Sequence, residues 1–70
     1  MLACEKNHRR LTKQTPCGTT VVVVTSRVGD RWETDVMGGQ LDGWTVESYT
    51  QREADRAHDG AVQLVQGACN

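Results

Sequence analysis

The chain has 70 residues, so it forms at most one small domain, and a large catalytic cleft is excluded. Val and Leu together number 13, and Ile and Phe are absent, which is close to the aliphatic content of disordered chains. A formal net charge of only −1 lacks the second mark of disorder, and we therefore expect a folded domain with a small core. No apolar run approaches the roughly 18 residues of a membrane span, so no membrane partner is expected.

Charge divides the chain into two parts. Residues 1–18 carry four Lys or Arg and one acid, a net charge of +3, whereas residues 19–70 carry four Arg and eight acids, a net charge of −4. We interpret residues 1–18 as a basic N-terminal arm and residues 19–70 as a small folded domain. Such an arm can meet nucleic acid, an acidic protein surface or a neighbouring copy, or it can fold back on its own domain as a solvated terminus. Its expected contact residues are Lys6, Arg9, Arg10 and Lys13.

Three β-strands are predicted after the arm. The four valines at residues 21–24 are flanked by threonines and are typical of a strand covered on both faces. Residues 32–37 then alternate with period two, and residues 44–49 do so again. Turn signals separate these segments at Gly29-Asp30, at Gly38-Gly39 and at Leu41-Asp42-Gly43.

One amphipathic helix of about 15 residues is predicted at the C-terminal end. Thr50 and Glu53 have the spacing of a capping box, and Gly67 is a natural stop. Small and apolar side chains fall on one face at spacings of three and four, namely Ala54, Ala57, His58, Ala61 and Val65, with Val62 and Leu64 widening it.

These elements predict an α+β fold, with a three-stranded antiparallel meander followed by the helix packed on one sheet face. Trp32, Val36, Trp44 and Val46, with two of the four valines, should face the helix. The opposite face is then polar and acidic, and it supplies the remaining expected partner-binding residues, Glu33, Asp35, Glu47 and Tyr49. Two unpaired sheet edges leave self-association open.

The three cysteines do not predict a secreted disulfide framework. Cys4, Cys17 and Cys69 are odd in number, and no secretory signal precedes them, so a reducing compartment with free thiols is expected by default. A Cys4–Cys17 or a Cys17–Cys69 disulfide remains an alternative. A zinc site is a further one, built from Cys4, His8 and Cys17 with His58 or Cys69 as fourth ligand, but the spacing matches no paired knuckle. We therefore expect no metal and no cofactor.

No residue pattern predicts an active site. His58 lies on the apolar helix face, where a buried histidine bonded to a backbone carbonyl or a strand carboxylate is the usual case. Glu33, Asp35 and Glu47 have the chemistry of general acids and bases, but no concave pocket is implied around them. We therefore expect no enzyme. The basic arm has no aromatic side chains to stack on bases, and the acidic domain would repel a polyanion, which argues against nucleic acid as partner.

From Trp32 to Val65 the chain resembles a family of small proteins of unknown function that tailed bacteriophages and prophages encode. The family pattern is a Glu-Thr-x-Val-Phe-Gly-Gly-like run, an Asp-containing turn, a Tyr-x-Thr strand end and a helix with Glu-Ala and a later His. The matching positions here are residues 33–39, 41–43, 49–51, 53–54 and 58. Met37 stands where the family more usually has an aromatic residue, and the basic arm has no match.

The resemblance implies a phage accessory protein, often encoded near virion genes, and it offers no catalytic residues. Our leading hypothesis is a non-enzymatic protein that binds a larger assembly as a minor virion or capsid-associated component, located in the virion or the host cytoplasm. One alternative is an early inhibitor of a host defence or transcription enzyme. The other is a zinc-stabilised nucleic-acid-binding module.

Overall fold

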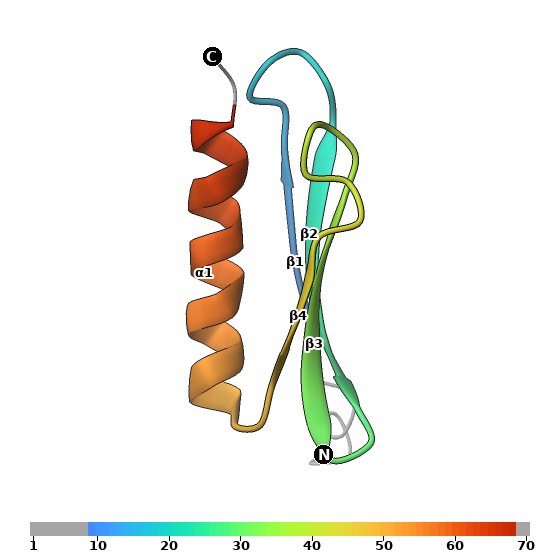
Figure 1. Cartoon of the computed structure of the whole chain (residues 1–70), viewed down its shortest axis with the longest axis vertical. Helices are drawn as coiled ribbons and strands as arrows, with labels where there is room; N and C mark the ends of the chain where they lie inside the picture. Colours follow the sequence, from blue (N-terminus) through green and yellow to red (C-terminus); the bar gives the residue numbers. More distant parts are fainter. Residues whose placement is uncertain (1–8, 69–70) are drawn as a thin grey trace.

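The computed structural model describes residues 9–68, which form a four-stranded antiparallel sheet with one helix against it (Figure 1). The strands lie side by side in chain order, so successive hairpins build a meander. The predicted α+β fold, a meander followed by a C-terminal helix packed on the sheet, is confirmed. The elements are β1 (Arg9–Gln14), β2 (Val21–Val28), β3 (Arg31–Met37), β4 (Thr45–Ser48) and α1 (Gln51–Gly67).

Strand β1 was not predicted, so the expectation of three strands is wrong. It pairs with β2 over its full length, from Arg9 opposite Ser26 to Gln14 opposite Val21. Residues 9–14 of the expected arm are therefore part of the sheet. Alternation in β1 places Arg10 and Thr12 on the helix side, and because these side chains are polar the strand shows no hydrophobic alternation in the sequence.

The core lies between α1 and the middle of the sheet. Val23 and Val36 face each other across β2 and β3 and are almost completely buried. The helix contributes Ala61 and Val65 to the same cluster, and small side chains at such positions let a helix approach a sheet closely. The predicted helix face is confirmed for its buried members, Ala54, His58, Ala61 and Val65. The expectation that Leu64 widens this buried face is wrong, since half of its surface is exposed.

The start of α1 follows from its capping residues. The Thr50 hydroxyl accepts a hydrogen bond from the Glu53 N–H at 3.1 Å, as the capping box predicts. The Glu53 carboxylate accepts its return bond from the Tyr49 N–H at 3.0 Å, one residue earlier than in the standard box. The cap thereby fixes the turn between β4 and α1. No helix within residues 9–68 is long and apolar enough to cross a membrane.

A buried histidine joins the helix to the sheet. His58 is fully buried, and its Nε2 lies 2.8 Å from the Thr12 hydroxyl of β1 while its Nδ1 lies 2.8 Å from the Thr25 hydroxyl of β2. The Thr25 hydroxyl also lies 2.8 Å from that of Thr34 on β3. The expectation of a buried, hydrogen-bonded histidine is confirmed, although its partners are hydroxyls rather than a carbonyl or a carboxylate.

Burial holds the pKa of His58 below its ordinary value, and the nearby Arg10 guanidinium lowers the pKa further. Asp59 and Asp55 act in the opposite direction but do not outweigh these two effects. In the neutral ring one nitrogen donates and the other accepts, so the two threonines satisfy both. The folded protein therefore favours the neutral imidazole.

The connection between β3 and β4 depends on Gly38 and Gly39, which both adopt positive φ angles. A Cβ on Gly38 would lie 2.5 Å from the Thr20 carbonyl oxygen, so the loop backbone packs directly against the start of β2. The Asp42 carboxylate accepts a 2.7 Å hydrogen bond from the Gly38 N–H and closes the loop. The predicted glycine turn is confirmed, and its glycines are needed for both conformation and space.

We predict that Gly38→Ala destabilises the fold by about 2–4 kcal/mol, because it adds backbone strain to a clash with rigid backbone. Gly29→Ala is the matched control, since Gly29 also has a positive φ but its Cβ would meet open space, and it should cost only about 1 kcal/mol. Gly60→Ala, inside the helix and unobstructed, should stabilise by up to about 1 kcal/mol. Urea unfolding measures all three. Equal losses for the variants at 29 and 38 would show that the loop does not pack tightly on β2.

We predict that acid weakens the fold through His58. The pKa of His58 is lower in the folded state than in the unfolded state, where it is about 6.5. The stability that the neutral ring contributes is therefore complete above pH 6.5 and is lost as the pH falls below 6.5. The loss can reach about 1.4 kcal/mol per pH unit. Unfolding free energies at pH 7.5 and pH 5 should differ more for the wild type than for His58→Gln.

His8→Gln is the control for this experiment, because it removes the other histidine and should keep the wild-type pH dependence. An NMR titration of the His58 ring in the wild type reads the same property without any substitution. A midpoint at or above 6.5 would contradict the prediction.

Candidate functional site

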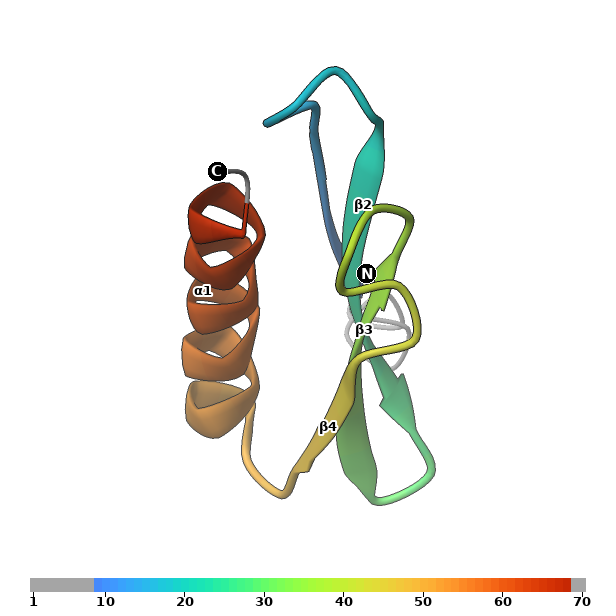
Figure 2. The ribbon, with the colours of Figure 1, turned by 45° about the horizontal axis from the view of Figure 1, so that its top comes forward.

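The sheet has one face that no described element covers. Both ribbon views show α1 on one side of the sheet only (Figures 1 and 2). Thr12, Thr25 and Arg10 reach α1, so strand alternation directs their neighbours in sequence to the other side. We call this side the open face. It is formed by Leu11 and Lys13 of β1, Val22 and Val24 of β2, Glu33, Asp35 and Met37 of β3, and Thr45 and Glu47 of β4.

The middle of the open face is apolar. Leu11 pairs with Val24, and Val22 pairs with Met37, so four apolar side chains occupy adjacent positions on three strands. Val24 is buried, whereas Leu11 is 54% exposed and Met37 is 49% exposed. Exposed apolar side chains that adjoin one another mark interaction surfaces more often than isolated ones do.

Carboxylates occupy the β3–β4 side of the open face. Glu33 lies directly opposite Glu47, and Asp35 lies between Val24 and Thr45. Arg31 reaches the Glu47 carboxylate at 3.2 Å, which leaves Glu33 facing a like charge across the strands. On the other side of the apolar residues, β1 presents the exposed Lys13. The open face therefore runs from a cation, across an apolar centre, to a group of acids.

The structure brings together only some of the predicted contact residues. Lys13, Glu33, Asp35 and Glu47 share the open face, as described. Tyr49 follows β4 and is 70% exposed. Lys6 lies outside the described residues, and of Arg9 only the backbone position in β1 is described.

Arg10 lies on the helix side instead, in line with the alternative that the basic segment folds back on its own acidic domain. Its guanidinium is 2.9 Å from Asp59 and 3.5 Å from Asp55. These side chains are all substantially exposed, and the two ion pairs are thus weak stabilisers in water. They nevertheless orient β1 against α1. They also engage Arg10, one of the cations that the sequence analysis expects to contact a partner.

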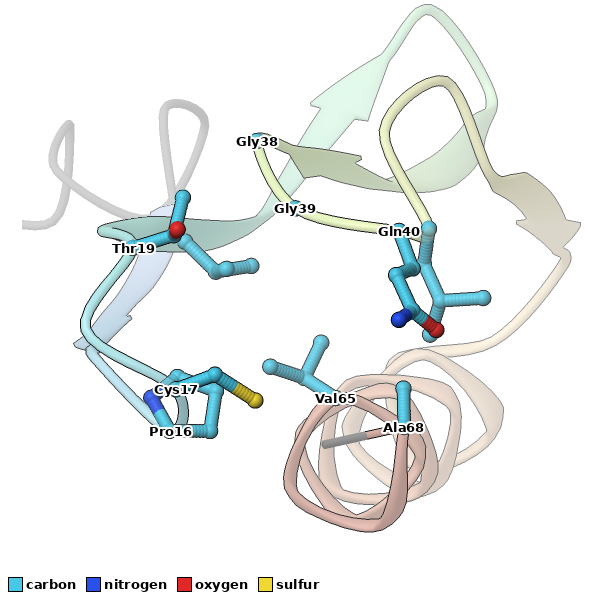
Figure 3. A pocket seen from close by; sticks show the side chains of 10 residues that line it. Pro16, Cys17, Thr19, Gly38, Gly39, Gln40, Val65 and Ala68 are labelled. Carbon is cyan, nitrogen blue, oxygen red and sulfur yellow. The ribbon is translucent and has the colours of Figure 1, made fainter. Parts of the chain in front are cut away.

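A small apolar cavity lies at one end of the molecule. It has a volume of about 320 Å³ and opens between the β1–β2 turn, the β3–β4 loop and the last turn of α1 (Figure 3). Its wall includes Cys17 from the turn, Gly39 and Leu41 from the loop, and Val65 and Ala68 from the helix end. No sequence pattern predicts this cavity, since its lining comes from three separate segments.

The cysteine expectation needs correction, because Cys17 is disulfide-bonded rather than a free thiol. A disulfide sulfur is not a thiolate and cannot serve as a zinc ligand. Within residues 9–68 no three metal-binding side chains gather at one point. The other residues of the zinc alternative, Cys4, His8 and Cys69, lie outside the described residues.

Comparisons of the chain with protein-family models, with curated proteins and with solved structures find no match. The resemblance to small phage proteins therefore stays a prediction from the sequence pattern, and the open face is interpreted from its own chemistry.

We predict that Glu33→Gln stabilises the fold by about 0.2–1 kcal/mol, because like charges directly opposite each other on adjacent strands repel. Asp35→Asn is the matched control, since Asp35 faces Thr45 and should change stability less. The gain should shrink in high salt, which screens exposed charges. Denaturant unfolding at low and high ionic strength measures both variants. A destabilised Glu33→Gln would show that this carboxylate has a favourable contact in the folded protein.

Proposed function

We propose that the protein is a non-enzymatic accessory protein of a tailed phage that attaches to a larger protein assembly as a minor virion or capsid-associated component. The open face is its attachment surface. The observation that carries the proposal is the exposure of Leu11 and Met37 beside Val22 and Val24 on a sheet face that α1 leaves uncovered. Burial of such side chains against a partner supplies the driving force for association.

Charge specifies the kind of partner that fits. Glu33, Asp35 and Glu47 lie on one side of the apolar centre, and Lys13 lies on the other. A complementary surface has an apolar patch with basic groups facing β3 and β4 and an acidic group facing β1. A protein lattice offers many identical copies of one such patch, which suits a small protein with a small core.

The disulfide at Cys17 supports a place in the particle rather than in the host cytoplasm. Disulfides persist in oxidising surroundings, whereas cytoplasmic reductants keep thiols reduced. The alternative of an early inhibitor of a host enzyme would require the protein to act in the cytoplasm.

We predict that Leu11→Asp and Met37→Asp each reduce binding to particles at least tenfold, because a carboxylate would be buried against the partner. The assay is co-sedimentation of the purified protein with purified virions in a density gradient. Leu64→Asp is the matched control, since Leu64 is an equally exposed apolar residue on α1, away from the open face, and this variant should bind like the wild type.

Two results would overturn the proposal. One is a wild-type protein that never sediments with particles and co-purifies instead with a single soluble host enzyme. The other is a Leu64→Asp variant that loses binding as strongly as the open-face variants. Circular dichroism of each variant confirms that the exposed substitutions leave the fold intact.

A further inference from the structure

The two edge strands of the sheet carry opposite charges. Within residues 9–68 no segment pairs with the outer edge of β1 or of β4, since the strands lie in the order β1-β2-β3-β4. Strand β1 carries three cations, Lys13 among them, and no acid. Strand β4 carries Glu47 and no cation, and the neighbouring β3 adds Glu33 and Asp35 against the single cation Arg31. One edge of the sheet is therefore basic and the other is acidic.

The outer edge of β4 presents the backbone groups of Thr45 and Glu47. The Val36 N–H of β3 donates to the Trp44 carbonyl at 2.9 Å, and the ladder bonds between β3 and β4 then continue from Val46 at every second residue. The residues between them turn their N–H and C=O groups away from β3. Thr45 and Glu47 thus have donors and acceptors that a further strand can pair with.

The outer edge of β1 presents the backbone groups of Leu11 and Lys13. The same alternation, followed through the strand registers, has Val24 bonded to β3 and Val23 bonded to Thr12 of β1. The neighbours of Thr12 along β1 are then the residues whose N–H and C=O groups point outward. Both edges therefore offer unpaired groups at residues whose side chains lie on the open face.

The geometry of these edges allows the meander to continue into a second copy. Directly opposite residues of an antiparallel pair place their side chains on the same face of a sheet. A β4 strand that pairs antiparallel with β1 of a second copy therefore keeps α1 of both copies on one side and both open faces on the other. Four strands at about 4.8 Å would separate successive helices by about 19 Å, which exceeds the helix diameter of roughly 10–12 Å.

Charge selects this pairing over the two alternatives. Pairing of β1 with β1, or of β4 with β4, brings like charges together, and like charges on an edge protect it against pairing with itself. Pairing of β4 with β1 brings the exposed Glu47 towards the exposed Lys13. No carboxylate of residues 9–68 forms an ion pair with Lys13, so its charge is open to a second copy.

We propose that the outer edge of β4 binds the outer edge of β1 of a second copy, in an antiparallel pairing with Lys13 beside Glu47. Backbone hydrogen bonds at Thr45 and Glu47 join the copies into one continuous sheet. Because the two edges differ, each copy in a pair keeps one free edge of the opposite kind. Assembly therefore proceeds head to tail, to a ring or a filament, and does not stop at two copies.

Sedimentation equilibrium of the purified wild-type chain at low salt measures this assembly. The average mass should rise with protein concentration from that of one chain to beyond that of two chains. A mass that stays at one chain at every concentration, or that stops at two chains, would overturn the proposal. The chain is measured alone, so the result is independent of whether the protein binds particles.

A charge exchange identifies the two edges. Lys13→Glu and Glu47→Lys should each weaken assembly about tenfold, because an attraction becomes a repulsion. A mixture of the two variants should assemble again, since every contact between unlike chains then joins opposite charges. Arg56→Glu on α1 and Asp30→Lys in the β2–β3 turn are the matched controls, and they should assemble like the wild type. Single variants with wild-type assembly, or a mixture that stays dissociated, would show that these edges do not meet.

Thr45→Pro distinguishes backbone pairing from a contact between charges alone. The Thr45 N–H points outward, so proline removes a donor from the edge and none from the ladder with β3. We expect this variant to stay monomeric where the wild type assembles, with a wild-type circular dichroism spectrum. A folded Thr45→Pro that assembles like the wild type would contradict the proposal, and the charge exchange decides it if this variant does not fold.

Discussion

The structure depends on one imidazole that links the helix to two adjacent strands of the sheet. Among the described residues His58 is the largest fully buried side chain, and its two ring nitrogens meet the hydroxyls of Thr12 and Thr25. These bonds tie α1 to β1 and β2 at once, and the contact from Thr25 to Thr34 extends the link to β3. A buried polar chain of this kind is stable only when every member has a partner. It therefore fixes the rotation and the height of the helix over the sheet more narrowly than valine packing alone would do.

The position of the helix determines what the rest of the molecule can do. A single helix covers one side of the four strands, and on the other side Leu11 and Met37 remain about half exposed. The charges are divided in the same way. The Arg10 side chain pairs with Asp59 and neutralises part of the negative charge of α1. Lys13, three residues further along β1, lies on the open face. Part of the charge contrast in the sequence therefore stabilises the fold through Arg10. The remaining charges lie on the open face, where a partner would contact them.

The sequence predicted those elements whose inner faces are apolar. The strands around Val23 and Val36, the glycine turn after Met37 and the Thr50 cap all follow from local patterns that tertiary contacts reinforce. Strand β1 escaped prediction because its inner residues are Arg10 and Thr12, whose partners, Asp59 and His58, lie more than 40 residues away. The hydroxyl partners of His58 escaped for the same reason. Hydrophobic periodicity detects burial against apolar neighbours and does not detect burial by hydrogen bonding.

For the candidate site, alternation in β3 and β4 was sufficient to place Glu33, Asp35 and Glu47 on one face, because side chains in a strand alternate whatever their partners are. The apolar centre was not predicted. Leu11 belongs to β1, which the charge pattern indicated as part of a basic arm, and Val24 belongs to a valine run with no alternation of its own. Adding β1 changes the chemistry of the face. Three strands alone would present Val22, Val24 and Met37 beside the three acids, whereas the fourth strand adds Leu11 beside Val24 and the cation of Lys13 beside Val22. An apolar strip between opposite charges selects a protein surface by shape and polarity together, which a purely acidic patch would not do.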